Sequence, residues 1–446
     1  MNWKWKVVES NTNFNFYIKV VRREWEDLIL DIGIIEIEKS NEFLKSLWAE
    51  MKKEFGKCAW QYNPYKIKQE NTINFGFMDI DVAVLNVKVT YKQKGSIIKI
   101  IFEYPKGEEE LEQSSPLGRR LKKVVRLARR NIGRKEEYVA GLEIKSYFPL
   151  LAYEGKHVTI KAFSSDFNKN NKIYFPFSAY DENQADGQVF QKMNEILDFL
   201  SVETNAPFWE DGTDSYYDYI DIPNNEIYQD TSFIDGLSLK NEFLSISQTG
   251  MRFLDYIVTD NGDDKDLALF LSACYHFHTA RKYDAQIHDF GGNKYYSSDD
   301  ASMLEIERCK KDTGLEPAYV LGNSQIEIAT TLYLSALEVI TLIGFEEKKC
   351  KECGQDVYQI SSRVKGIAKK YFDSYTAEEF TAMYNKRSNY LHRGYMLTDK
   401  APTTSSVPLL DVENESGCIY PENNLQWLRE HTSYILRAFY REQFMK

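Results

Sequence analysis

The chain has 446 residues, about three times a typical ~150-residue domain, which predicts two or three domains. Its composition, 43% hydrophobic and 28% charged with only 11 prolines, excludes collagen-like, low-complexity and mostly disordered proteins. The net charge of −11 taken alone argues against a nucleic-acid partner, but this charge is distributed unevenly. Residues 118–135 hold nine Lys or Arg and no acid, whereas residues 193–239 hold eleven Asp or Glu and no Lys or Arg.

The sequence also leads us to expect neither a membrane nor a secreted protein. No stretch of about 20 uninterrupted apolar residues is present, so no membrane partner is expected. The first ten residues alternate Trp and Lys and lack the apolar core of a signal peptide. Six cysteines do not make a disulfide framework, and we therefore expect a cytoplasmic protein.

The N-terminal half predicts a mixture of helices and strands. Apolar residues at helical spacing predict helices, and β-branched or aromatic runs bounded by turns predict strands. The predicted helices cover 41–55 and 116–133, and the predicted strands cover 82–91, 97–104, 157–163 and 172–177, with 82–104 forming a hairpin. We assign residues 1–192 to an α+β module that senses a trigger or binds substrate, with a division into two subdomains near 110–140 left open.

Residues 193–238 are rich in Asp, Asn, Pro and Gly and predict an acidic connection to residues 239–446. The C-terminal part predicts an all-α bundle, so the expected fold class is an α+β half followed by a helical-bundle domain. Its predicted helices cover 264–287, 323–345, 361–372, 377–393 and 421–444. Thr376 and Glu379 form a capping-box pattern before the fourth helix, and Gly394 stands where a left-handed C-terminal residue is expected.

Two charges interrupt apolar helix faces in this half. Arg387 lies in the middle of the apolar stripe of the fourth helix, and Glu338 is the only charged side chain between residues 328 and 345. A buried charge needs a partner, so Arg387 or His392 is the expected partner of Glu338. His392 lies about 140° from Arg387 on an ideal helix, so one copy does not aim both groups at one phosphate, whereas two facing copies could.

Three stretches carry a family resemblance. They are Ser-Ala-Leu-Glu at 335–338, Tyr-Gln-Ile-Ser-Ser-Arg-Val at 358–364, and Tyr-Asn-Lys-Arg-Ser-Asn-Tyr-Leu-His-Arg-Gly at 384–394. In order and spacing they resemble the HEPN superfamily of small helical domains, most closely its Apea-type branch, with Arg387 and His392 as the Arg-x4–6-His motif. The resemblance covers about residues 260–446. Ser388 stands where the family often has a polar Asn, Asp or His, and Asn389 follows one position later.

The resemblance implies a metal-independent endoribonuclease that needs no cofactor and pairs as a homodimer on RNA. Such chemistry needs a proton-transfer group and a cation that stabilises the phosphorane. His392 suits proton transfer and Arg387 suits bidentate phosphate contact. Asn389 or Ser388 could orient the phosphate, and Glu338 could hold Arg387 in place. The resemblance also implies a bacterial anti-phage or abortive-infection toxin, with a phage-derived or other protein trigger acting on the N-terminal half.

Other residues are candidates for substrate binding. Residues 348–393 contain ten basic and five acidic side chains, which places the motif in a positive neighbourhood. The basic helix is either a solvated amphipathic face or a surface for RNA, phosphate or an acidic partner. The candidates are Lys386, Ser388 and Arg393 on the fourth helix and Arg119, Arg120, Lys122, Lys123, Arg126 and Arg130 on the basic helix.

Two alternatives remain open. Arg387 and Glu338 could be a structural ion pair, which would make the chain a catalytically inactive HEPN regulator that binds RNA or protein. Cys350 and Cys353 are half of a zinc ribbon and lack a second Cys-x2-Cys, so they are weak metal candidates. Cys274, His276 and His278 scatter around a helix at steps of 200° and are interpreted as core or surface residues.

Overall fold

A computed structural model of the chain describes most of its residues and divides them into two compact units. The units are Met1–Glu136 with Ala179–Ala185, and Glu137–Ser178 with Asp186–Lys446. The described residues are 4–7, 18–21, 25–33, 35–56, 58–67, 71–80, 84–92, 95–105, 113–146, 148–164, 169–211, 218–219, 232–234, 236–240, 243–259, 264–288, 324–345, 348–349, 356–357, 360–394 and 425–446.

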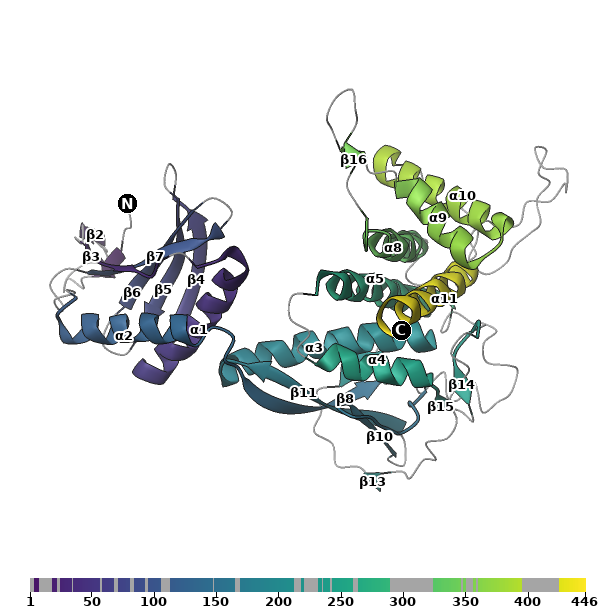
Figure 1. Cartoon of the computed structure of the whole chain (residues 1–446), viewed down its shortest axis with the longest axis horizontal. Helices are drawn as coiled ribbons and strands as arrows, with labels where there is room; N and C mark the ends of the chain where they lie inside the picture. Colours follow the sequence, from purple (N-terminus) through teal and green to yellow (C-terminus); the bar gives the residue numbers. More distant parts are fainter. Residues whose placement is uncertain are drawn as a thin grey trace, which may run out of the picture. The chain divides into compact units, whose positions relative to one another are not determined.

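The first unit contains a five-stranded antiparallel sheet in the order β3-β7-β6-β5-β4 (Figure 1). Its elements are β3 (Trp25–Asp31), α1 (Ile37–Phe55), β4 (Ala59–Lys66), β5 (Thr72–Asp79), β6 (Val84–Tyr91), β7 (Ile97–Pro105) and α2 (Pro116–Arg130), with a separate pair β1 (Lys4–Val7) and β2 (Ile18–Val21). The predicted hairpin is confirmed, because β6 pairs with β7 in antiparallel register.

One core joins both helices to one face of this sheet. Side chains alternate along the strands, so β5 is buried at every second residue. The predicted basic helix is confirmed as α2, with Leu121, Val124 and Ala128 fully buried and its basic residues on the opposite face. Ser115 begins α2, because its hydroxyl accepts the backbone N–H of Gly118 at 3.0 Å.

The second unit begins with a mixed layer of strands and helices. Its sheet has the order β12-β8-β11-β10-β13, and β9 pairs with β10. These elements are β8 (Glu136–Lys145), β9 (Tyr153–Glu154), β10 (Thr159–Ser164), β11 (Lys169–Ala179), α3 (Glu182–Thr204), β12 (Trp209–Asp211), β13 (Asp218–Tyr219), β14 (Leu239–Lys240), β15 (Phe243–Leu244) and α4 (Gln248–Val258).

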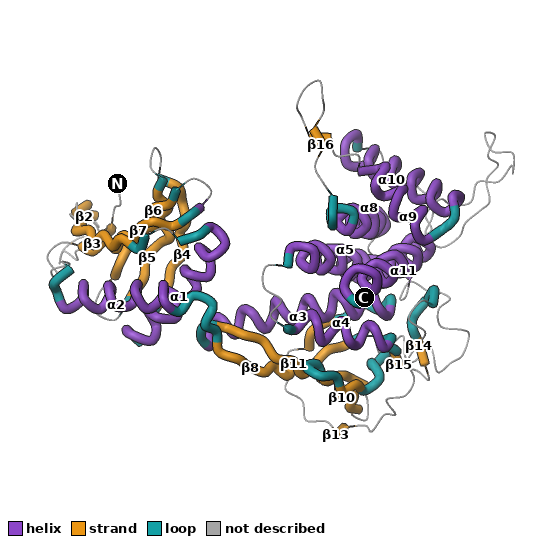
Figure 2. The backbone as a smooth tube through the Cα atoms, in the orientation of Figure 1, coloured by secondary structure: helices purple, strands orange, loops and turns teal. Residues whose placement is uncertain are grey.

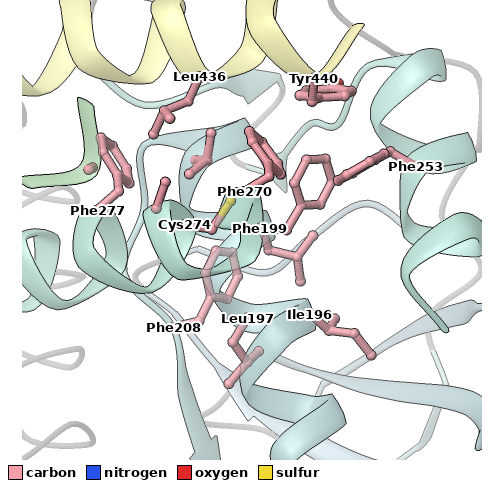
Figure 3. Close-up of a cluster of buried hydrophobic side chains, with 14 of the residues drawn as sticks. Ile196, Leu197, Phe199, Phe208, Phe253, Phe270, Cys274, Phe277, Leu436 and Tyr440 are labelled. Atoms are coloured by element: carbon pink, nitrogen blue, oxygen red, sulfur yellow. The ribbon is translucent and has the colours of Figure 1, made fainter. Parts of the chain in front are cut away.

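A group of helices completes this unit (Figure 2). They are α5 (Lys265–His288), α8 (Ser324–Ile340), α9 (Ile360–Tyr371), α10 (Ser374–Arg393) and α11 (Leu425–Phe444), with a strand pair β16 (Lys348–Lys349) and β17 (Asp356–Val357). Figure 3 shows the centre of the core, where Phe199, Phe253, Phe270 and Tyr440 pack together. The expected helical C-terminal part is therefore confirmed.

The domain boundaries differ from those expected. The sheet of β8, β10 and β11 shares one continuous core with the C-terminal helices and does not belong to the first unit. The division at Glu136 lies in the 110–140 range that was left open. The acidic connection expected over 193–238 begins instead as α3, whose residues 196–204 are all buried. A helical segment that is buried on all sides has a weak amphipathic period, which is why the sequence of residues 196–204 did not predict a helix.

Among the described helices, none has the length and apolar content that crossing a bilayer requires.

Candidate active site

Helix α10 carries the Arg-x4-His residues and has well-defined ends. Asp373 begins it, because its carboxylate accepts the backbone N–H of Thr376 at 2.8 Å. This bond lowers the pKa of Asp373 from its usual value. The prediction that Thr376 begins the helix with a capping box to Glu379 is therefore wrong, because the helix begins about one turn earlier. Gly394 ends the helix with φ +71°, the left-handed conformation that its sequence position predicted.

Arg387 and Glu338 form a two-pronged ion pair between α10 and α8. Arg387 Nη1 lies 2.5 Å from Glu338 Oε1, and Arg387 Nη2 lies 3.0 Å from Glu338 Oε2. The same Nη2 donates to Ser335 Oγ at 3.1 Å. The side chains are 13% and 18% exposed, so water screens this pair only in part. Of the two partners that the sequence suggested for Glu338, the structure therefore pairs it with Arg387.

Tyr384 adds an aromatic wall to this ion pair. The Arg387 guanidinium carbon lies 5.6 Å from the Tyr384 ring centroid, within cation–π range. Burial raises the pKa of the Tyr384 hydroxyl, and its hydrogen bond to Glu338 raises it further. The hydroxyl is thus protonated at neutral pH and acts as a donor to Glu338. Two further side chains, Tyr384 and Ser335, hold the Glu338–Arg387 pair in one orientation.

The remaining residues of the motif lie on the exposed end of α10. Asn389, His392 and Arg393 are exposed, while Lys386 and Ser388 are half-buried. His392 and Arg393 stand in the last turn, where the helix dipole favours positive charge. Among the described residues, no hydrogen bond or ion pair joins His392 to the Arg387–Glu338 pair. One chain therefore brings Arg387 and Glu338 together and leaves His392 facing solvent.

The structure adds one residue that sequence reasoning missed. His276 on α5 lies close enough to Glu338 and Arg387 for both charges to affect its pKa, which burial lowers. Its Nδ1 is buried and has no hydrogen-bond partner among the described residues. The sequence offered only the spacing of His276 from Cys274 and His278. That spacing does not predict that α5 packs against α8. No local signal in the sequence could have found this placement.

The other two members of that trio are structural. Cys274 is fully buried, which raises the pKa of its thiol well above the usual value. His278 is buried, and its Nδ1 lies 2.7 Å from Asp198 Oδ1 while its Nε2 accepts the backbone N–H of Phe208 at 3.0 Å. Burial lowers the pKa of His278. These contacts support the interpretation of Cys274 and His278 as core residues.

A second polar cluster in the core also escaped prediction. Asp284 and Arg429 are fully buried and lie 3.3 Å apart, joining α5 to α11. The Tyr333 hydroxyl donates to Asp284 Oδ2 at 2.8 Å, which adds α8 to the cluster. Glu430 accepts from Arg429 at 3.2 Å and from the Gly236 N–H at 2.8 Å. These bonds satisfy buried charges and fix the mutual register of the three helices.

The basic residues of α2 divide into two groups. Glu54 of α1 binds Arg120 at 3.0 Å and Lys123 at 2.7 Å, and these ion pairs lower the pKa of Glu54. The Arg120 guanidinium also lies 4.2 Å from the Phe55 ring centroid. The others are exposed, namely Arg119, Lys122, Arg126, Arg129 and Arg130. Arg120 thus contributes to helix packing, whereas the exposed group is available to a ligand.

The described residues contain no group of three or more His, Cys, Asp or Glu side chains that could hold a metal. Cys350 and Cys353 lie outside the described residues.

Comparison of the chain with models of known families, with curated proteins and with solved structures finds no match.

Proposed function

We propose that the chain is a metal-independent endoribonuclease of the HEPN type that acts as a homodimer. The observation that carries this proposal is the partly buried Arg387–Glu338 pair. It lies within about two turns of the exposed end of α10, which carries Asn389, His392 and Arg393. The Apea-type resemblance of residues 335–338, 358–364 and 384–394 supports it.

In this proposal each group has a defined task. His392 transfers protons to and from the ribose 2′-oxygen or the leaving 5′-oxygen, a task for which an exposed imidazole is suited. Arg387 stabilises the charge of the phosphorane, and Glu338 positions Arg387. His276 is a half-buried imidazole whose lowered pKa favours the neutral form, which can accept a proton. Asn389 orients the phosphate.

A dimer follows from the directions of Arg387 and His392. The two side chains are about 140° apart around α10, so a single copy offers them to different sides. Leu391, beside His392, is 48% exposed, and Tyr275, beside His276, is 54% exposed. Large apolar side chains exposed next to polar site residues are typical of protein interfaces. Two facing copies would bury them and supply one Arg387 and one His392 to a shared cleft.

The cellular role in this proposal is an anti-phage toxin of the bacterial cytoplasm. The N-terminal unit would receive a phage-derived or other protein trigger, and RNA cleavage would then stop growth, as in abortive infection. Lys386, Ser388 and Arg393 would contact the RNA backbone beside the reacting phosphate.

The test is cleavage of total RNA and tRNA by the purified chain in EDTA, with analysis of the product ends. We expect 2′,3′-cyclic phosphates, and we expect His392→Ala and Arg387→Ala to abolish both cleavage and growth inhibition. Asn385→Ala is the matched control, since Asn385 is an exposed polar residue on the same helix. Full activity of both site variants would refute the assignment.

One observation favours a second candidate, a catalytically inactive HEPN regulator that binds RNA or protein. Both Nη atoms of Arg387 are already occupied by Glu338 and Ser335, and only Nε has no partner among the described residues. A guanidinium in this state acts as a structural tie. Two results together would favour this candidate. The parent chain would not cleave RNA in the presence of its trigger, and Arg387→Ala would still bind RNA.

A further inference from the structure

A pocket of about 520 Å³ lies in the first unit, between the exposed face of α2 and the end of β3. This volume falls in the range of about 300–1,000 Å³ that is typical of small-molecule sites. Its apolar floor is formed by Leu30, Ile32 and Val125, which are 4%, 3% and 5% exposed. Its wall is cationic and comes from α2.

The cations of this wall form one stripe along the helix. Arg119, Lys122, Arg126 and Arg129 follow one another at steps of three or four residues, so neighbours lie about 5–6 Å apart at their Cβ atoms. In the part of the chain that the structure describes, none of these four is ion-paired to an acid; Lys123, which also lines the pocket, is paired to Glu54. Like charges at this spacing repel one another, and a bound anion would relieve the repulsion.

The opposite rim of the pocket has a fixed shape. Asp31 lines it and accepts the Gly33 N–H on Oδ1 at 2.9 Å, which leaves Oδ2 for another donor. Gly33 has φ +70°, a conformation that favours glycine, and a Cβ added there would lie 3.4 Å from Arg129 Nη1. The Arg129 guanidinium therefore lies against the Gly33 backbone and is held at the pocket wall.

We propose that this pocket binds a nucleotide that carries two or more phosphates. The phosphates bind Arg119, Lys122 and Arg126, whose neighbouring charges suit several phosphate groups in a row. The base covers the apolar floor, and Asp31 accepts a hydrogen bond from an exocyclic amine or a ribose hydroxyl. A nucleotide would use the cations, the apolar floor and the Asp31 acceptor together. A phosphate backbone alone would use only the cations.

A single-stranded RNA is the competing ligand, and the geometry disfavours it. Tracking an RNA backbone needs a groove that continues beyond a few nucleotides. Here Glu54 neutralises Arg120 and Lys123, so the α2 cations without an ion pair among the described residues all line the pocket, apart from Arg130. The pocket belongs to the first unit, so this inference goes beyond the proposed nuclease and does not depend on it.

The experiment is equilibrium dialysis of radiolabelled ATP and GTP against the full chain. We expect saturable binding of at least one nucleotide, and we expect an Arg119→Ala/Arg126→Ala variant to bind it at least about tenfold more weakly, since each removed cation takes away charge-assisted hydrogen bonds. Arg130→Ala is the matched control, because Arg130 is also an exposed cation of α2 and does not line the pocket. The nucleotide affinity of this variant should stay within about twofold of that of the parent chain.

Three results would overturn the proposal. The first is the absence of saturable binding of either nucleotide up to about 1 mM. The second is an equal loss of affinity in the Arg130 control, which would indicate a diffuse basic surface. The third is binding of a short single-stranded RNA that unlabelled ATP and GTP cannot displace, which would assign the stripe to RNA. Circular dichroism of each variant verifies the fold, and the same assay on His392→Ala separates this outcome from that of the nuclease proposal.

Discussion

Removing the Glu338 carboxylate should destabilise the contact between α8 and α10 by an amount that the structure sets. Glu338→Ala removes two charge-assisted hydrogen bonds and leaves Arg387 with the Ser335 hydroxyl as its bonded partner. Breaking a fully buried ion pair costs about 3–5 kcal/mol, and an exposed pair contributes about 0–1 kcal/mol. With side chains 13% and 18% exposed, this pair lies toward the buried limit, and we expect a loss of about 2–3 kcal/mol.

Hydrogen exchange followed by mass spectrometry measures this loss locally. Peptides from 324–340 and 374–393 report the free energy of opening of α8 and α10. A loss of about 2–3 kcal/mol corresponds to exchange about 30-fold to 150-fold faster. Glu442→Ala is the matched control, because Glu442 pairs with Lys370 on the surface at 45% and 53% exposure. Its loss should change exchange by less than about fivefold.

A double-mutant cycle decides whether the two charges act on each other. The loss in Glu338→Ala/Arg387→Ala should be smaller than the sum of the single losses by about 1–3 kcal/mol, since contacting residues couple by such amounts. Single variants that exchange within about threefold of the parent chain, or losses that simply add, would refute the reasoning that this pair ties α8 to α10.

Three further predictions concern other parts of the molecule. In Gly76→Ala, the new Cβ would lie 2.2 Å from the Gln61 carbonyl oxygen, so thermal denaturation should show the first unit unfolded. Gly95→Ala, whose Cβ would have no atom within 4 Å, should lower the free energy of unfolding by only about 1 kcal/mol. Equal effects of the two substitutions would contradict this steric argument. Burial lowers the pKa of His278, so below about pH 6.5 the unfolded chain binds a proton at this histidine that the folded chain does not bind. The free energy of unfolding should therefore fall on acidification by up to about 1.4 kcal/mol per pH unit. Thermal scans of His278→Gln should show a weaker fall with pH, and an unchanged pH dependence would exclude this histidine as the cause. Asp284→Ala should cost about 2–3 kcal/mol in urea denaturation, because it removes one of the two carboxylates that pair with the buried Arg429 guanidinium and leaves Glu430 as the other; a loss below about 1 kcal/mol would show that the cluster is not stabilising.

Local signals predicted a large part of the fold. The helices found as α1, α2, α5, α9 and α10 begin and end close to the expected residues. In α1, α2 and α9 the signal is an apolar stripe at helical spacing. The hairpin of β6 and β7 was also readable, since its strands are neighbours in sequence. In α10, the αL residue at Gly394 was correct, and the start was missed by one turn because Asp373 offered an equally good capping side chain.

The candidate site could be predicted only in part. Arg387 and Glu338 were recognisable as charges on apolar helix faces, and a buried charge needs a partner, so the sequence pointed to their pairing. His276 could not be added, because its place near the pair depends on the packing of α5 against α8. Likewise, the sequence showed a basic helix at 116–133, but which cations Glu54 neutralises and which line a pocket depends on α1 and β3.

By itself the sequence determined the class of each strong helix, the basic face of α2 and the two charges that had to be satisfied. These are properties of periodicity and of desolvation, which act over a few residues or on one side chain. The tertiary structure alone decided that the sheet of β8, β10 and β11 belongs with the C-terminal helices and that residues 196–204 of α3 are buried on all sides. Those outcomes depend on contacts between segments far apart in the chain, and no local pattern records such contacts.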